Sequence, residues 1–159
     1  MPIGQRQRIR TVFLRPEESY ALRHAARLLG MPVATLRRDV RAGHHDAQKQ
    51  RGKWFLTWRQ IALFAFGRWS LADIHRALGA DAAHVLPPLL TLRPVTVRLP
   101  EYILRALELM AADERRTVDD VLIYELAELA GTVADEMEPR IPGFRQAYLF
   151  PGEERRRVR

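Results

Sequence analysis

The sequence contains no cysteine, and this absence excludes several classes of protein at once. Without a thiol there is no disulfide framework, no thiolate metal site and no cysteine nucleophile. No apolar run approaches the roughly 18 residues of a membrane span, and the basic first residues lack the apolar core and cleavage site of a secretory signal. We therefore expect a cytoplasmic protein that does not associate with membranes.

Signatures of catalysis are missing as well. The sequence has no phosphate-binding glycine loop, no nucleophile elbow and no pair of carboxylates in an evident pocket. The nearest approach to a metal site is the His-His-Asp segment 44–46, but adjacent residues rarely converge on one ion and no further ligands stand at a recognised spacing. We therefore expect no enzyme activity, no cofactor and no metal.

Positive charge is concentrated in the first part of the chain. The net charge is +7, but residues 1–98 hold 17 basic and 6 acidic side chains, which gives +11, whereas residues 99–159 hold 9 and 13, which gives −4. A basic excess confined to one region is typical of a protein that binds a polyanion. The alternative is a basic surface that is merely solvated.

Two short helices joined by a tight turn are predicted near the N-terminus. The first covers 17–29, with its apolar residues on one face, and ends at Gly30, the usual residue just past a helix end. The second, "ATLRRDVRAG" at 34–43, buries Leu36 and Val40 and leaves its arginines facing other directions. A second helix rich in arginine suits the major groove of DNA, as in a helix-turn-helix.

A small basic hairpin and two more helices are predicted next. In "QRGKWFLTW" at 50–58, a glycine turn is flanked by Arg51 and Lys53 and followed by aromatic residues that would seat the hairpin against the core. The basic tip would then reach phosphate. Capping patterns at 57–60 and 70–73 predict the starts of the two following helices.

Together these pieces resemble the DNA-binding domain of the MerR and excisionase superfamily. "ATLRRDVRAG" is similar to its recognition helix, "RGKWFLTWRQIA" to its wing and the next helix, and "GRWSLADIHRALG" to its G-x-S-L-x-x-I segment. The resemblance covers 18–79 and implies a winged helix-turn-helix. The residues expected to contact DNA are Thr35, Arg37, Arg38, Arg41, Arg51 and Lys53. Arg38 stands where relatives often have an aromatic residue, so base-level detail does not transfer.

A strand followed by a helix is predicted after a linker. The linker, 80–92, is rich in proline and is expected to have little regular structure. In "RPVTVRLPEYILRALELM", Val95, Val97 and Leu99 alternate with polar residues as in a half-buried strand, and helical spacing follows Pro100. One strand cannot satisfy its own backbone donors and acceptors, so this strand requires a partner.

A polar turn and a second helix with a Thr117–Asp120 cap complete this region. The order resembles the ribbon-helix-helix fold of small bacterial repressors and many antitoxins, over residues 93–131. The resemblance implies an antiparallel pairing with the same strand of a second chain, and hence a homodimer. The residues expected at the dimer contact are Val95, Val97, Leu99, Leu122 and Leu126.

The ribbon resemblance leaves open whether this second module also contacts DNA. Its polar strand face would carry Thr96 and Arg98. Against this, Asp119 and Asp120 stand in the first turn of the second helix, where they favour the helix dipole and oppose a phosphate. Dimerisation alone is favoured, and dimerisation with DNA contact is the alternative.

The last residues combine breaks with aromatic side chains. Prolines and glycines after residue 138 predict no regular element there. Disordered ends are usually poor in aromatic residues, so this tail is expected either to fold onto its own core or to anchor a toxin or another protein. The candidate anchor residues are Phe144, Tyr148, Leu149 and Phe150.

The sequence thus predicts a mainly α protein with short β elements. Its expected parts are a basic arm at 1–17, the winged domain at 18–79, the linker at 80–92, a dimerisation module at 93–135 and a tail at 136–159. The expected function is a sequence-specific transcriptional repressor that binds double-stranded DNA as a homodimer, with an autoregulating antitoxin as one form. The alternatives are a protein-binding antitoxin or adaptor that neutralises a partner, and an excisionase-like factor that bends DNA.

Overall fold

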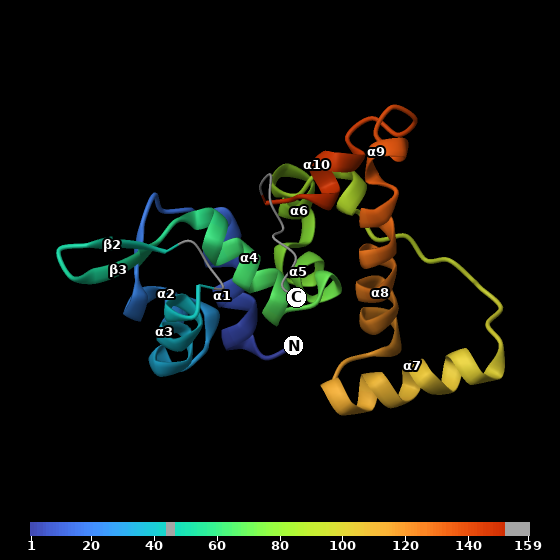
Figure 1. Cartoon of the computed structure of the whole chain (residues 1–159), viewed down its shortest axis with the longest axis horizontal. Coiled ribbons are helices and arrows are strands. Elements are labelled where there is room, and N and C mark those ends of the chain that lie inside the picture. The colour runs from blue at the N-terminus through green and yellow to red at the C-terminus, as the bar shows by residue number, and fades with distance from the viewer. Residues whose placement is uncertain (44–46, 152–159) are drawn as a thin grey trace. The chain divides into compact units, whose positions relative to one another are not determined.

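The computed structural model of the chain describes residues 1–43 and 47–151 (Figure 1). It is mainly helical, with one small three-stranded antiparallel sheet, as the sequence predicts at this level. The chain divides into two compact units. Unit 1 comprises residues 1–85 together with Pro151, and unit 2 comprises residues 86–150.

Unit 1 packs helices around a small sheet. Its elements are α1 (Ile3–Leu14), β1 (Tyr20–Ala21), α2 (Leu22–Leu29), α3 (Val33–Arg41), β2 (Gln48–Gln50), β3 (Lys53–Leu56), α4 (Trp58–Arg68), α5 (Leu71–Leu78), a 3-10 turn η1 (Gly79–Asp81) and α6 (Ala82–Val85). The largest fully buried side chains of this unit are Ile9, Val12, Tyr20, Leu29, Leu36, Leu56, Ile61, Ile74 and Leu78. Every helix from α1 to α5 contributes to this core, so the unit has one hydrophobic centre.

The expected basic arm at 1–17 is largely a helix of unit 1. Ile9, Val12 and Phe13 of α1 are buried, and α1 contacts α2, α4 and α5. The Phe13 ring meets Phe66 edge-on, with 5.7 Å between ring centroids. Apolar residues spaced three and four apart are the reason this basic segment folds as a helix, and burial of that stripe fixes it to the core.

The turn between α2 and α3 is tightly held. Gly30 has the left-handed φ of +62° that ends α2, and its amide donates to the carbonyl of Ala26. A Cβ atom at Gly30 would lie 2.9 Å from the Arg8 guanidinium carbon, and Arg68 Nη2 donates to the Gly30 carbonyl at 2.8 Å. The geometry of this turn therefore requires glycine.

We expect Gly30→Ala to lower the free energy of unfolding by about 1–3 kcal/mol, because alanine resists the positive φ and its methyl group would displace Arg8. Gly67→Ala is the matched control. Gly67 is an exposed residue within α4, and no atom lies within 4 Å of its Cβ position. Alanine there should be neutral or stabilising by about 0.5–1 kcal/mol. Denaturant unfolding of both variants checks the difference, and equal losses would contradict it.

The sheet extends the predicted hairpin by one strand. β2 and β3 pair antiparallel, with Gln50 opposite Lys53, and β1 adds to β3 with Tyr20 opposite Leu56. Tyr20 was expected on a helix, but it lies on β1, where it is almost fully buried. Its hydroxyl accepts a hydrogen bond from the Glu17 amide at 2.7 Å, and burial raises the pKa of Tyr20 above its ordinary value.

The two predicted caps of unit 1 are confirmed. The Thr57 amide donates to Gln60 Oε1 at 2.8 Å, and the Thr57 side chain accepts from the Gln60 amide, which closes a capping box at the start of α4. Ser70 Oγ accepts from the Asp73 amide at 3.1 Å at the start of α5. These bonds satisfy amides that would otherwise lack partners in the first turns.

The expected linker at 80–92 contains short helical elements instead of irregular chain. Residues up to Val85 form η1 and α6, and a second 3-10 turn, η2 (Pro88–Leu90), follows in unit 2. Arg10 of α1 explains part of this order. Its guanidinium donates to the carbonyl of Leu78 at 3.1 Å and pairs with Asp81 at 2.8 Å, so the end of α5 and η1 are fixed to α1.

Unit 2 is built on one pair of longer helices. Its elements are η2, α7 (Glu101–Glu114), α8 (Val118–Thr132), α9 (Ala134–Met137) and α10 (Phe144–Tyr148). Thr117 caps α8 as predicted, accepting from the Asp120 amide at 3.1 Å. The α7–α8 contact has a small core of Leu107, Ala111 and Val121. Both predicted helices are therefore present, with starts as expected.

The strand predicted at 95–99 is not formed in the single chain. Residues 91–100 have no regular secondary structure, and Val95 and Val97 are 80% and 56% exposed. On α8, Leu126, which was expected at the dimer contact, is also exposed, at 52%. The physical reason is the same in both cases: one chain offers this strand no neighbour and this half of α8 no covering element.

The tail forms a short helix where none was expected. α10 contacts η2, α8 and α9, and Tyr148 lies so close to Gly131 of α8 that a Cβ there would overlap its hydroxyl. The four candidate anchor residues are all half-buried: Phe144, Tyr148, Leu149 and Phe150. The part of the tail up to residue 150 therefore folds onto unit 2.

Candidate nucleic-acid interface

Helix α3 presents the main group of predicted site residues. Leu36 and Val40 are buried in the core, at 0% and 4% exposure, and they fix the helix by its inner face. Arg37, Arg38 and Arg41 are exposed on the remaining faces, as the sequence predicts. A helix held by two buried residues presents its outer side chains from a rigid support.

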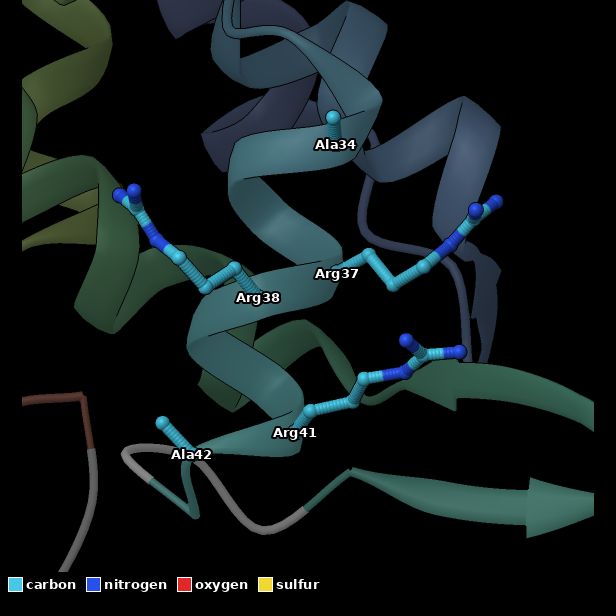
Figure 2. A pocket seen from close by; sticks show the side chains of 5 residues that line it. All are labelled: Ala34, Arg37, Arg38, Arg41 and Ala42. Carbon is cyan, nitrogen blue, oxygen red and sulfur yellow. The ribbon is translucent and has the colours of Figure 1, made fainter.

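The three arginines leave α3 on two different sides. Figure 2 shows Arg37 and Arg41 projecting together from one side of the helix and Arg38 from the other. They surround a shallow hollow that Ala34 and Ala42 also line. Because alanine side chains are short, a ligand can approach the helix closely between the guanidinium groups.

Charge pairing differs between the two sides. Arg38 Nε lies 3.4 Å from Asp39 Oδ1, a long ion pair that reduces the net charge on its side. Neither Arg37 nor Arg41 makes a hydrogen bond or ion pair with any residue in 1–43 or 47–151. The Arg37–Arg41 side therefore offers the stronger attraction for an anion.

Thr35 does not join the Arg37–Arg41 side. It is half-buried, and residues three apart on a helix share a side, which groups Thr35 with Arg38. The DNA-contact residues predicted on α3 therefore fall into two groups. Arg37 and Arg41 are exposed and unpaired with any described residue. Thr35 and Arg38 lie on a second side, where Asp39 partly neutralises the charge of Arg38.

The β2–β3 hairpin projects from the helices of unit 1 (Figure 1) and carries further cations. Arg51 and Lys53 are exposed, as predicted. Lys49 is an addition that the sequence analysis missed. Its ammonium lies 5.8 Å from the centroid of the Trp54 ring, which faces it from the neighbouring strand. The only sequence feature that indicates a site role for Lys49 is its position in a polar segment just before a glycine turn.

The remaining predicted residues belong to unit 2. Thr96 and Arg98 are exposed in the segment without regular structure. Asp119 and Asp120 occupy the first turn of α8, where the Asp120 amide is already bound by the Thr117 cap. The N-terminus of α8 therefore interacts favourably with the carboxylates of its own first turn, and these carboxylates oppose the binding of a phosphate.

Residues 1–43 and 47–151 hold no group of three or more histidine, cysteine or acidic residues that could bind a metal, and the segment 44–46 lies outside them. In the same part of the chain, no helix combines the length and apolar character needed to cross a bilayer. Comparison with family models, with curated proteins and with solved structures finds no match for this chain.

Proposed function

We propose that the chain is a sequence-specific DNA-binding protein that represses transcription as a homodimer. The observation that carries the proposal is the exposed Arg37–Arg41 pair, which has no partner among the described residues and stands on a helix fixed by buried Leu36 and Val40. With the cationic β2–β3 hairpin beside the same core, this arrangement supports a winged helix-turn-helix.

DNA matches the size and charge of this surface. The major groove, about 12 Å wide, admits one α-helix. An arginine that projects from such a helix can donate two hydrogen bonds to O6 and N7 of guanine, the commonest specific contact in such complexes. Arg37 and Arg41 lie one helical turn apart, so both can reach base edges or the flanking phosphates from one docking position.

The charge balance of unit 1 favours DNA over simple solvation of a basic surface. Residues 1–85 hold 15 basic and 6 acidic side chains, which gives +9. The acids are largely engaged inside the unit: Asp81 pairs with Arg10 at 2.8 Å and Asp73 with Arg76 at 2.9 Å. Arg37 and Arg41 of α3 and the cations of the hairpin have no acidic partner among the described residues, and they lie on exposed elements, where a polyanion can approach.

The homodimer is supported by an incomplete core in unit 2. Residues 86–150 are all described, and only six of their hydrophobic residues are buried: Leu86, Leu107, Ala111, Val121, Ala134 and Ala147. Such a core is small for a unit of this size. Val95, Val97 and Leu126 of the same unit are exposed. A second copy of this chain would cover them and pair the two extended segments antiparallel, as in a ribbon-helix-helix.

A twofold dimer also explains how one short helix could give useful specificity. Two copies of α3 would bind two half-sites, and the second contact benefits from the effective concentration set by the first. Occupation of a promoter by such a dimer would repress transcription. An antitoxin that represses its own operon is one protein of this kind, but the half-buried tail residues give no separate support to a toxin contact.

The test is a selection of binding sites by the full chain from random duplex DNA. We expect enriched sequences to contain an inverted repeat, with half-site centres about one helical turn or a multiple of it apart. Binding should weaken steeply as salt increases. Failure to enrich any sequence would refute sequence-specific binding. Strong bending of the selected duplex without repression of a reporter gene would favour the architectural alternative.

A further inference from the structure

Arg8 of α1 has a buried side-chain nitrogen without a hydrogen-bond partner. No atom of residues 1–43 or 47–151 accepts a hydrogen bond from its Nε, and no acidic residue of these ranges forms an ion pair with its guanidinium. A charged donor that is buried without an acceptor is destabilising. In a native protein such a group usually indicates an acceptor from outside the chain, such as a water molecule or an ion.

The Arg8 guanidinium lies between two glycines. A Cβ at Gly30 would lie 2.9 Å from both the guanidinium carbon and Nε of Arg8, and a Cβ at Gly4 would lie 3.7 Å from its Nη1. The guanidinium therefore extends from the exposed first turn of α1 to the turn between α2 and α3. Neither glycine has a side chain that would cover it, and part of the Arg8 surface remains exposed. A small ligand can therefore approach this group.

A second guanidinium is held at the same turn. Arg68, the last residue of α4, donates from Nη2 to the Gly30 carbonyl at 2.8 Å, so both arginines contact one glycine. Arg68 is exposed, and no acidic residue in the described ranges pairs with it. Two like charges at one residue repel each other. An anion between them would relieve this repulsion and would provide acceptors for Arg8.

A phosphate group matches this pair of arginines better than a carboxylate does. A carboxylate carries one charge and is planar, so it offers its best geometry to one guanidinium. A phosphate monoester carries a charge of about −1.5 to −2 near neutral pH and has three acceptor oxygens. These oxygens point in different directions, so two guanidinium groups from different helices can each donate paired hydrogen bonds to them.

We propose that Arg8 and Arg68 bind one phosphate group beside the α2–α3 turn. After a small rotation of its side chain, Arg8 donates from Nε and one Nη atom, and Arg68 donates from the nitrogens that Gly30 does not engage. The bound group joins α1, the turn and α4, and so fixes the position from which α3 starts. Arg8 lies outside the residues that resemble the winged domain, and the site does not require that the protein bind DNA.

Two sources provide this chemistry: a free phosphate or small phosphorylated molecule, and the backbone of bound DNA. The first arm of the experiment titrates the full-length protein with inorganic phosphate at constant ionic strength. NMR follows the Nε–H signal of Arg8 and the amide signal of Gly30, and both should shift and saturate. At ten times the dissociation constant, phosphate should raise the melting temperature by about 3–6 °C relative to chloride.

Arg8→Met and Arg68→Met should each weaken phosphate binding about tenfold or more, because each removes charge-assisted hydrogen bonds. The matched control is Arg6→Met, which removes the same charge from an exposed position of α1 and should bind phosphate as the wild type does. The site is overturned by a wild type whose signals do not saturate, by unchanged binding in both site variants, or by an equal loss in the control.

The second arm adds duplex DNA to the phosphate-saturated protein. Displacement of phosphate, together with a salt dependence of duplex binding that falls by about one in Arg8→Met, identifies the DNA backbone as the source. Phosphate that stays bound identifies a free phosphate or a small phosphorylated molecule. A protein that binds phosphate but no duplex would refute the proposed function and leave the phosphate site standing.

Discussion

Replacing both Arg37 and Arg41 with alanine is expected to abolish specific DNA binding while the fold is retained. Both side chains are exposed and neither is paired with a described residue, so their removal should cost little stability. If each guanidinium makes one base-level contact, the double variant loses about 2–6 kcal/mol of specific binding free energy. Titration of the selected duplex and of a random-sequence duplex measures this loss, and circular dichroism checks the fold.

The matched control is Arg23→Ala with Arg27→Ala. These two arginines are also exposed, also lie four residues apart, and stand on the adjacent helix α2. Their removal changes the net charge by the same amount, so it should weaken both duplexes alike through lost phosphate attraction. Specific binding that survives in the Arg37/Arg41 variant, or an equal loss of specificity in the control, would contradict the role of α3.

Arg38 provides a finer test of the two sides of α3. The resemblance to a recognition helix groups Arg37 with Arg38, but residue order alone does not show on which side each one projects relative to the core. In the structure Arg38 projects away from Arg37 and lies near Asp39. We therefore place the stronger DNA contact on Arg37 and Arg41.

The helices of the central region could be predicted because their signals are local. Leu36 and Val40, four residues apart, determine which face of α3 is buried, and the caps at Thr57 and Ser70 determine where α4 and α5 begin. The β2–β3 hairpin follows from a glycine turn between strand-forming residues in the same way. Each of these elements is specified within a few residues of sequence.

The elements that were missed depend on contacts with distant residues. β1 has two residues, too few for a period, and exists because Tyr20 pairs opposite Leu56. α10 follows proline and glycine breaks and is fixed by the contact of Tyr148 with Gly131. The prolines and glycines of the tail disfavour a regular element by their intrinsic propensities, but tertiary packing stabilises α10 nonetheless. No local pattern in the sequence shows such pairings.

Residues 93–99 are a different case, because the proposed ribbon would give them regular structure only with a second molecule. Alternation of Val95, Val97 and Leu99 indicates a strand, yet the single chain leaves all three exposed and without regular structure. A strand needs a neighbour to bind its backbone groups, and no element of unit 2 supplies one. The sequence pattern and the single-chain structure are both explained if the neighbour is the same segment of another copy.

Val97→Asp is expected to convert the proposed dimer into monomers. In the proposed ribbon, Val97 lies at the centre of the alternating apolar face, so each copy would bury one carboxylate in place of an apolar side chain. The loss of hydrophobic transfer free energy and the burial of a charge together weaken association of the dimer by at least about 3 kcal/mol per chain. Counted over two chains, this raises the dissociation constant by about four orders of magnitude. Sedimentation velocity at micromolar concentration measures the change.

Thr96→Asp is the matched control, because it places the same carboxylate one residue away. Successive strand residues face opposite sides, so this carboxylate would stay in solvent and the dimer should persist. The monomeric Val97→Asp chain should keep the fold of unit 1 and bind one half-site weakly, without dependence on half-site spacing. A monomeric wild type, a dimeric Val97→Asp variant, or equal dissociation of both variants would each refute the shared ribbon. The proposed DNA contacts of α3 would then have to be made by a single chain.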